Sequence, residues 1–310
     1  MFNVFIDGRE GTTGLQIYER LAKRGDINLI TIPEELRKDV SARKERLNAA
    51  DICFLCLPDA AARESVSLIE NPSVRVIDAS TAHRTADGWV YGLPELSAER
   101  REAIARSPRV ANPGCHATGF ITLVAPLVKG GILGAGYPLT AHSVTGYSGG
   151  GKKMIAEYEA EGRSVLLSSP RQYSLSLSHK HLPEMVKECA LSHAPIFNPI
   201  VGDFYCGMCV TVPLYKSLLL KKMGVDDIRN YFAEYYASQN FVKVAKKEEI
   251  PAYLPANELA GTNLLKIYVS GNDDMILMCS VFDNLGKGAS GAAVQNMNIM
   301  LGLDETFSLV

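Results

Sequence analysis

Cys115 has the setting in this sequence that most favours chemistry. It follows the turn-forming run Asn112-Pro113-Gly114 and precedes an apolar segment that we expect to be helical over residues 117–128. Thiolate is the reactive form of cysteine, and the positive end of a helix dipole lowers the pKa of a thiol there. An arbitrary cysteine is usually an inert core residue, so it is this setting that makes Cys115 a candidate nucleophile.

Two histidines in the run HKHLPE, at residues 179–184, are candidate bases for that thiol. Histidine titrates near neutral pH and can take and return a proton. Pro183 suits the first turn of a helix, which would follow directly. Taken alone, the run could equally be a polar loop with two surface histidines.

The first glycine-rich loop, GREGTTG at residues 8–14, lies directly between an expected strand and an expected helix. Its GxxGxxG spacing differs from the familiar GxGxxG, but the context is that of a dinucleotide site, in which backbone N–H groups approach a pyrophosphate. A plain glycine turn is the alternative. The candidate cofactor-binding residues here are Gly8, Arg9, Gly11, Thr12, Thr13 and Gly14.

The end of the second expected strand bears on the choice between NADP and NAD. NAD-selective sites often place an acid there, whereas here Arg37 and Lys38 follow shortly after the strand. Such cations, helped by Arg9, would suit a 2′-phosphate and hence NADP. The intervening Glu34 and Glu35 leave the pattern mixed, and the cations could instead be solvated charges.

A second glycine loop, GYSGGGKK at residues 146–153, joins a strand to a helix expected over 152–161. Backbone N–H groups in such a loop can form an anion-binding nest. Gly149 and Lys152 are therefore candidates for holding a phosphate or carboxylate of the substrate. A flexible connection is the other interpretation.

The element pattern predicts two kinds of sheet. In the first part, strands at 4–6, 27–32, 52–57 and 74–77 alternate with helices at 15–24, 39–49, 59–69 and 98–106, which predicts a parallel α/β sheet. After Cys115, strands at 139–145, 210–214, 264–269 and 275–282, the last two joined by a turn at 272–274, predict an α+β layer with an antiparallel hairpin. A final helix is expected over 288–301, ending at Gly302.

Composition excludes several classes of function. A net charge of −2 provides no basic stripe for nucleic acid. There is no run of about 20 apolar residues and no signal-like N-terminus, so we expect a cytoplasmic protein without a membrane partner. Seven scattered cysteines indicate a reducing compartment. The two CxxC patterns, at 53–56 and 206–209, lie in strand-like runs that point their thiols to opposite faces, so we expect no metal site.

Four ordered motifs, YGLPEL at 91–96, NPGC at 112–115, HKHLPE at 179–184 and DNLGKGA at 283–289, resemble those of N-acetyl-γ-glutamyl-phosphate reductases. The chain length and the His116-Ala117-Thr118 continuation resemble the short form of that family. The likeness spans nearly the whole chain.

The resemblance implies a Rossmann-type NADP-binding domain over residues 1–114, completed by a C-terminal helix at 286–310. It also implies a glyceraldehyde-3-phosphate-dehydrogenase-like catalytic and oligomerisation domain over 115–285. The cofactor would be NADP(H), the pathway arginine biosynthesis and the assembly a homodimer or homotetramer. The nucleophile falls on Cys115, and the base on His181 rather than His179, because His181 stands nearer to the Pro-Glu pair.

Further site residues are implied by the same resemblance. Asn284, Gly286 and Gly288 would approach the nicotinamide end of the cofactor. Residues 78–84 read DASTAHR where longer relatives have DLSADFR, so Arg84 is retained and His83 is not expected to be catalytic. The substrate residues expected overall are Ser80, Arg84, Asn112, Gly149, Lys152, His179 and Glu184.

The expected reaction is the reduction of an acyl phosphate to an aldehyde through a thioester on Cys115. Aspartate-semialdehyde dehydrogenase, or another acyl-phosphate reductase, is the nearest alternative, since it would share the thiolate chemistry. A non-catalytic NADP sensor would have no need for a helix-start cysteine together with a histidine pair.

Overall fold

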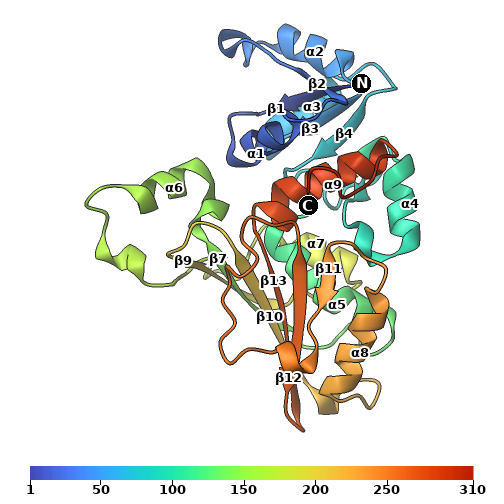
Figure 1. Cartoon of the computed structure of the whole chain (residues 1–310), viewed down its shortest axis with the longest axis vertical. Coiled ribbons are helices and arrows are strands. Elements are labelled where there is room, and N and C mark those ends of the chain that lie inside the picture. Colours follow the sequence, from blue (N-terminus) through green and yellow to red (C-terminus); the bar gives the residue numbers. More distant parts are fainter. Residues whose placement is uncertain (310) are drawn as a thin grey trace. The chain divides into compact units, whose positions relative to one another are not determined.

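The computed structural model describes residues 1–309 and divides into two compact units (Figure 1). Unit 1 consists of Met1–Pro113 and Ala289–Val310, and unit 2 of Gly114–Gly288. Unit 1 is therefore built from two separate stretches of the chain, whereas unit 2 is continuous.

The sheet of unit 1 is parallel throughout, as predicted. Within the described chain it has six strands in the order β2-β1-β3-β4-β6-β5. All four residues of β3 are buried, as expected for a central strand covered on both faces. The strands are β1 (Phe2–Asp7), β2 (Ile27–Ile30), β3 (Ile52–Leu55), β4 (Arg75–Asp78), β5 (Val90–Tyr91) and β6 (Arg109–Ala111).

The helices of unit 1 follow the predicted alternation. They are α1 (Thr12–Leu21), α2 (Val40–Ala49), α3 (Asp59–Ser67), α4 (Ala98–Arg106) and α9 (Gly291–Met300). The prediction for α4 is confirmed at both ends. Helix α1 begins three residues earlier than predicted, because its first turn grows directly out of the glycine loop at Gly11.

Helix α9 packs against α4 and β4, and all of its residues are buried. Three of those residues carry amides, and their burial is tolerated because they are hydrogen-bonded. Gln295 donates to Glu95 Oε1 at 2.9 Å, and Asn298 Oδ1 accepts from Arg24 at 2.6 Å. The C-terminal segment is thus an integral part of the unit 1 core.

Unit 2 contains a mixed sheet with the order β11-β12-β13-β10-β7-β9-β8 in the described residues. The predicted hairpin is confirmed: β12 and β13 pair antiparallel, and Asn272 Oδ1 accepts the backbone N–H groups of Asp274 and Met275 in the turn. The strands are β7 (Thr140–Gly146), β8 (Arg171–Gln172), β9 (Ile196–Gly202), β10 (Met208–Tyr215), β11 (Val242–Val244), β12 (Leu265–Gly271) and β13 (Met275–Phe282).

One face of this sheet is covered by α5 (Cys115–Lys129), which packs on β10 and β13. The contact is close because Gly119 has no side chain: a Cβ there would lie 2.5 Å from Val210 Cγ2 and 2.7 Å from Ser280 Oγ. The helices α7 (Leu182–Glu188) and α8 (Val225–Tyr235) accompany α5, packing on it and on β12 respectively.

The opposite sheet face is partly open. On β13, Ile276 and Met278 are buried whereas Met275 and Leu277 are exposed, which is the alternation of a sheet with one covered face. We call the exposed side the open face; Tyr215 of β10, directly opposite Met275, belongs to it.

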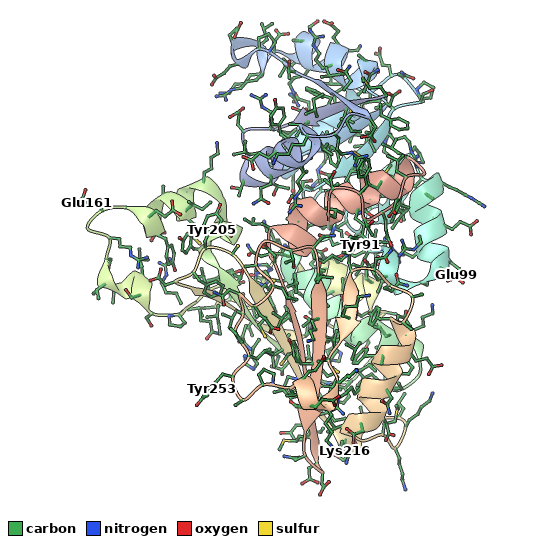
Figure 2. All side chains as sticks on the ribbon, viewed as in Figure 1. Tyr91, Glu99, Glu161, Tyr205, Lys216 and Tyr253 are labelled. Atoms are coloured by element: carbon green, nitrogen blue, oxygen red, sulfur yellow. The ribbon has the colours of Figure 1, made fainter. Side chains whose placement is uncertain are left out.

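An arm extends from the β7 and β9 region of unit 2 (Figure 1). It contains α6 (Gly151–Glu159) and a short turn at Val165–Ser168, and Glu161 lies at its far end (Figure 2). Tyr205 is labelled in Figure 2 near the base of the arm. Its ring centroid lies 5.7 Å from that of Tyr147. Among residues 1–309, no helix has the length and apolar character needed to cross a bilayer.

Candidate active site

Cys115 is the first residue of α5 and is partly exposed. The preceding Gly114 provides no side-chain cap, so the N-terminal N–H groups of the helix and their partial positive charge face the thiol region. Gly288 approaches closely: a Cβ there would lie 3.0 Å from Cys115 Cβ. The structure therefore places Cys115 in the helix-start setting that the sequence predicted.

Glu184, predicted to contact substrate, holds the turn before Cys115. Its Oε2 accepts the Gly114 backbone N–H at 3.0 Å, and its side chain is 1% exposed. Helix α7, which carries Glu184, also packs against α5. The motif at 179–184 and the cysteine are thus brought together by a contact between two helices.

His179 and His181 lie next to one another at the start of α7. Their ring centroids are 4.7 Å apart, and the His181 backbone N–H donates to His179 Nδ1 at 3.2 Å. Both rings contact His116, the neighbour of Cys115 in the sequence. The His116 ring centroid lies 5.4 Å from that of His179 and 5.5 Å from that of His181. His181 is buried whereas His179 is partly exposed.

His116, which was not predicted as a site residue, lies beside Cys115. It is 3% exposed, and its Nδ1 and Nε2 lie 2.7 Å from Ser143 Oγ and from the Tyr173 hydroxyl. Burial, followed by the nearby charges of His179 and Lys180, lowers the pKa of His116 to about 3. His116 is therefore a neutral imidazole beside the nucleophile. Its position directly after Cys115 was the signal that could have revealed it.

Tyr173 and Ser143 were also missed. Burial, followed by the nearby Cys115, raises the pKa of the Tyr173 hydroxyl, so the phenol stays protonated near neutral pH. No motif marks either residue, because each reaches the site through the folding of unit 2.

The second glycine loop forms a short turn at Tyr147–Gly150 before α6. A Cβ on Gly149 would lie 3.4 Å from Asn284 Nδ2, so the structure brings these two predicted site residues together. Asn284 is tied into unit 2: Oδ1 accepts from Gly207 N at 2.8 Å, and Nδ2 donates to Ser148 Oγ at 3.0 Å. Lys152 is exposed in the first turn of α6.

Gly286, also predicted to contact the cofactor, lies against the backbone of a neighbouring loop. A Cβ there would come within 2.2 Å of the Thr262 carbonyl oxygen. The backbone around Asp283 is similarly fixed, since its carboxylate accepts the N–H groups of Gly261 and Leu285. Only glycine fits at position 286, so this segment has a rigid shape in unit 2.

The first glycine loop lines a cavity of about 410 Å³ within unit 1. Gly8 has φ +88°, and a Cβ there would lie 2.4 Å from the Cys56 carbonyl oxygen; one on Gly14 would lie 2.5 Å from the Gly8 carbonyl oxygen. Thr12 Oγ1 is buried without a hydrogen-bond partner among the described residues. Together with the uncapped start of α1, this loop fits the pyrophosphate of a dinucleotide.

Cations also line this cavity. Arg9 pairs with Glu10 at 3.1 Å, and Arg37 pairs with Glu34 at 3.4 Å on the surface; Lys38 also lines the cavity. Arg43, which no sequence pattern marked, is a buried cation that contacts Asp7 at 3.1 Å and Glu64 at 2.8 Å. This charge set fits a phosphate group near Arg37 and Lys38, whereas Arg43 is already neutralised by its two carboxylates.

Ser80, Arg84 and Asn112 form part of a hydrogen-bonded network within unit 1. Ser80 Oγ donates to Asp78 at 2.7 Å, and Arg84 Nε donates to the Asn112 carbonyl at 3.0 Å. The Asn112 side chain donates to the Ala289 carbonyl at 3.0 Å. His83 contacts Asp78 at 2.6 Å and stacks on a tryptophan ring, so its contacts are structural.

The cysteines outside the site are all thiols within residues 1–309. Burial raises the pKa of Cys56 to about 12 and that of Cys206 to about 11, so neither is an activated nucleophile. In the described residues, no group of three or more His, Cys, Asp or Glu could hold a metal ion.

Comparison with known proteins identifies the family. Residues 3–105 match the semialdehyde dehydrogenase NAD binding domain, and residues 115–284 match the semialdehyde dehydrogenase dimerisation domain. The N-acetyl-gamma-glutamyl-phosphate reductase of Mesorhizobium japonicum is 50% identical over 97% of this chain and 99% of its own length. The chain belongs to the N-acetyl-gamma-glutamyl-phosphate reductase family. A family member from Pseudomonas putida, reductase 2, is 48% identical over 96% of both chains.

The fold of this reductase family member is shared with more distant enzymes. Aspartate semialdehyde dehydrogenase from Francisella tularensis superposes with a TM-score of 0.72 at 16% identity, covering 97% of this chain and 100% of its own. The Candida albicans enzyme, solved with NADP, gives 0.69 at 14% identity, over 97% and 98% of the two chains. The predicted Rossmann-type and dehydrogenase-like fold and the predicted family are confirmed.

Proposed function

We propose that this chain reduces N-acetyl-L-glutamyl 5-phosphate to N-acetyl-L-glutamate 5-semialdehyde with NADPH, releasing phosphate, as a step of arginine biosynthesis. The observation that carries the proposal is the position of Cys115 at the start of α5, with α7 packed against that helix and the two histidines before α7 in contact with His116. Relatives that are 46–50% identical over nearly the whole chain carry the name of this reaction.

In the first step, the His181 imidazole takes the proton from Cys115 Sγ, and the thiolate attacks the acyl carbon. A carbon–sulfur bond forms, the carbon–oxygen bond to phosphate breaks, and the phosphate leaves with the bonding electron pair and takes a proton from solvent. The start of α5 favours the thiolate, because its dipole stabilises negative charge there. The product of this step is a thioester on Cys115.

Bound NADPH supplies the hydride that reduces the thioester carbon. The backbone N–H groups at the start of α5 stabilise the oxygen that becomes negatively charged. As the carbon–sulfur bond breaks and the aldehyde forms, His181 returns its proton to Cys115 Sγ. His179, whose Nδ1 accepts the His181 backbone N–H, orients this base.

The cofactor residues follow from the fit of the cavity in unit 1. Gly8, Gly11 and Gly14 let the backbone approach the pyrophosphate, and the orphaned Thr12 hydroxyl, with its neighbour Thr13, offers donors. Arg37 and Lys38, with Arg9, would hold the 2′-phosphate that distinguishes NADP from NAD.

Unit 2 and the predicted substrate residues complete the proposal. We propose that the nicotinamide end of the cofactor binds to the fixed segment that contains Asn284, Gly286 and Gly288. We assign substrate anions to Gly149 and Lys152, and we keep Ser80, Arg84 and Asn112 as proposed substrate residues. Glu184 acts by holding the turn before Cys115.

We further propose that the protein is a cytoplasmic homodimer or homotetramer assembled through the open face. The matched description of residues 115–284 is a dimerisation domain, and the open face carries exposed Leu277, Met275 and Tyr215 on adjacent strands. Burial of such an apolar face is favourable.

A direct assay tests the function. Phosphate-dependent reduction of NADP should be observed with N-acetylglutamate semialdehyde and should be at least a hundredfold slower with aspartate semialdehyde. The opposite preference would reassign the substrate. Absence of turnover with both aldehydes would refute the reductase activity.

A further inference from the structure

Three side chains beside Cys115 are joined by hydrogen bonds and have no role in the reaction steps proposed above. Ser143 Oγ lies 2.7 Å from His116 Nδ1, and His116 Nε2 lies 2.7 Å from the Tyr173 hydroxyl. Ser143 is fully buried on β7, and His116 is 3% exposed on α5. Strand β7, helix α5 and the segment that follows β8 thus meet through one imidazole.

The direction of these hydrogen bonds follows from burial. A neutral imidazole donates through one nitrogen and accepts through the other. Within residues 1–309, the Ser143 hydroxyl has His116 as its only side-chain partner, so if it accepted from Nδ1 its own buried O–H would lack an acceptor. Leaving a buried donor without an acceptor is unfavourable. Ser143 therefore donates to Nδ1.

This direction determines the role of the third residue. With Nδ1 accepting, the proton of His116 is on Nε2 and is donated to the Tyr173 oxygen. Among the described residues the Tyr173 hydroxyl has no other hydrogen-bond partner, so its own O–H is available to solvent or to a bound ligand. Tyr173 is partly exposed, which leaves that donor accessible.

The location of the donor indicates which ligand it meets. His116 follows Cys115 in the first turn of α5, and Tyr173 also contacts His179 at 5.9 Å between ring centroids. The phenol thus borders the same histidine cluster that serves the thiol. We propose that Tyr173 donates a hydrogen bond to the acyl oxygen of the group bound to Cys115, and that His116 and Ser143 are positioning residues for this donor.

The chemistry required of Tyr173 is hydrogen bonding without proton transfer. Burial and the nearby Cys115 raise its pKa, so the phenol keeps its proton while negative charge develops on the acyl oxygen. The pKa of His116 is lowered to about 3, so the imidazole stays neutral near neutral pH. The directions of its hydrogen bonds with Ser143 and Tyr173 are therefore kept. The inference rests on the proposed reductase function.

The test compares Tyr173→Phe with the wild-type enzyme in the phosphate-dependent assay. We expect kcat to fall about 100-fold, the lower end of the cost of losing one oxyanion donor, while the KM values for phosphate and NADP stay within about threefold. Tyr231→Phe is the matched control, because it removes one hydroxyl that donates to the Pro126 carbonyl elsewhere in unit 2. It should keep wild-type kcat.

The positioning role of His116 is tested with a double-mutant cycle. His116→Phe keeps an aromatic ring but breaks both hydrogen bonds, and combining it with Tyr173→Phe should cost no more activity than the larger single effect. A kcat for Tyr173→Phe within twofold of wild type, a change confined to the KM for phosphate, or fully additive effects would overturn the inference. An inactive wild-type enzyme would instead refute the proposed function, so the two failures are distinguishable.

Discussion

Gly114 and Glu184 are 70 positions apart in the sequence but are joined by a 3.0 Å hydrogen bond from the Gly114 backbone N–H to the buried carboxylate. This bond fixes the turn that delivers Cys115 to the start of α5. Glu184→Ala should therefore lower kcat by about tenfold or more and reduce the melting temperature by several degrees, because a buried N–H loses a charged acceptor.

Glu184→Gln is the control for that effect, since it keeps an oxygen that can accept from Gly114. Steady-state kinetics and thermal unfolding of both variants provide the measurement. Equal behaviour of the Ala and Gln variants would show that the hydrogen bond does not support the turn.

Cys115→Ser should abolish turnover, because a serine hydroxyl has a far higher pKa than a thiol and is not ionised by a helix dipole. Binding of NADPH, followed by its fluorescence, should stay within about twofold of wild type, because the proposed cofactor cavity is built from unit 1. Measurable phosphate-dependent turnover by the serine variant would contradict a thioester mechanism.

The charge on the cofactor cavity predicts a change in cofactor preference. Replacing Arg37 and Lys38 together by Ala should raise the KM for NADP about tenfold or more and leave the KM for NAD almost unchanged, because only NADP carries the 2′-phosphate. Lys44→Ala is a suitable control, as this exposed lysine pairs with Glu70 instead. A parallel increase in both KM values would locate the 2′-phosphate elsewhere.

The lowered pKa of His116 predicts a pH dependence of stability. In the unfolded chain this histidine takes up a proton near pH 6.5, but the folded protein resists protonation down to about pH 3. Stability is therefore lost as the pH falls below 6.5, by up to about 1.4 kcal/mol per pH unit. His116→Phe should show a shallower loss of unfolding free energy between pH 7 and pH 5.

Urea unfolding at the two pH values measures this slope. Tyr173→Phe serves as the comparison, since it keeps the buried imidazole and should keep the wild-type slope. If His116→Phe and wild type lose the same free energy, the histidine does not couple protonation to folding.

The open face predicts the effect of a surface charge on assembly. Leu277→Lys should shift the protein toward monomer in light scattering after gel filtration, because Leu277 lies 39% exposed on the apolar open face. Leu220→Lys, on a leucine that is 67% exposed outside the strands, should leave the mass unchanged. A wild-type mass for the Leu277 variant would place the interface elsewhere.

Local patterns in the sequence were sufficient to predict the parallel sheet, the β12–β13 hairpin and the helix that begins at Cys115. Ser143 and Tyr173 could not be predicted, because they lie 27 and 57 positions from His116 and meet it only through the packing of unit 2. Strand β9 was missed because Pro199 interrupts its pattern, and α8 was missed although Val225, Ile228 and Phe232 recur at helical spacing. Buried Arg43 gave no signal, since its carboxylate partners come from two other elements.

The return of the chain to unit 1 through α9 has a consequence for biosynthesis. The strands and helices of Met1–Pro113 are made first, yet the helix that fills their core is made after all of Gly114–Gly288. Domains generally fold as units during synthesis. The continuous unit 2 can therefore fold as soon as it is made, whereas unit 1 cannot complete its core until α9 has been synthesised. The first unit to be translated is therefore the last to be completed.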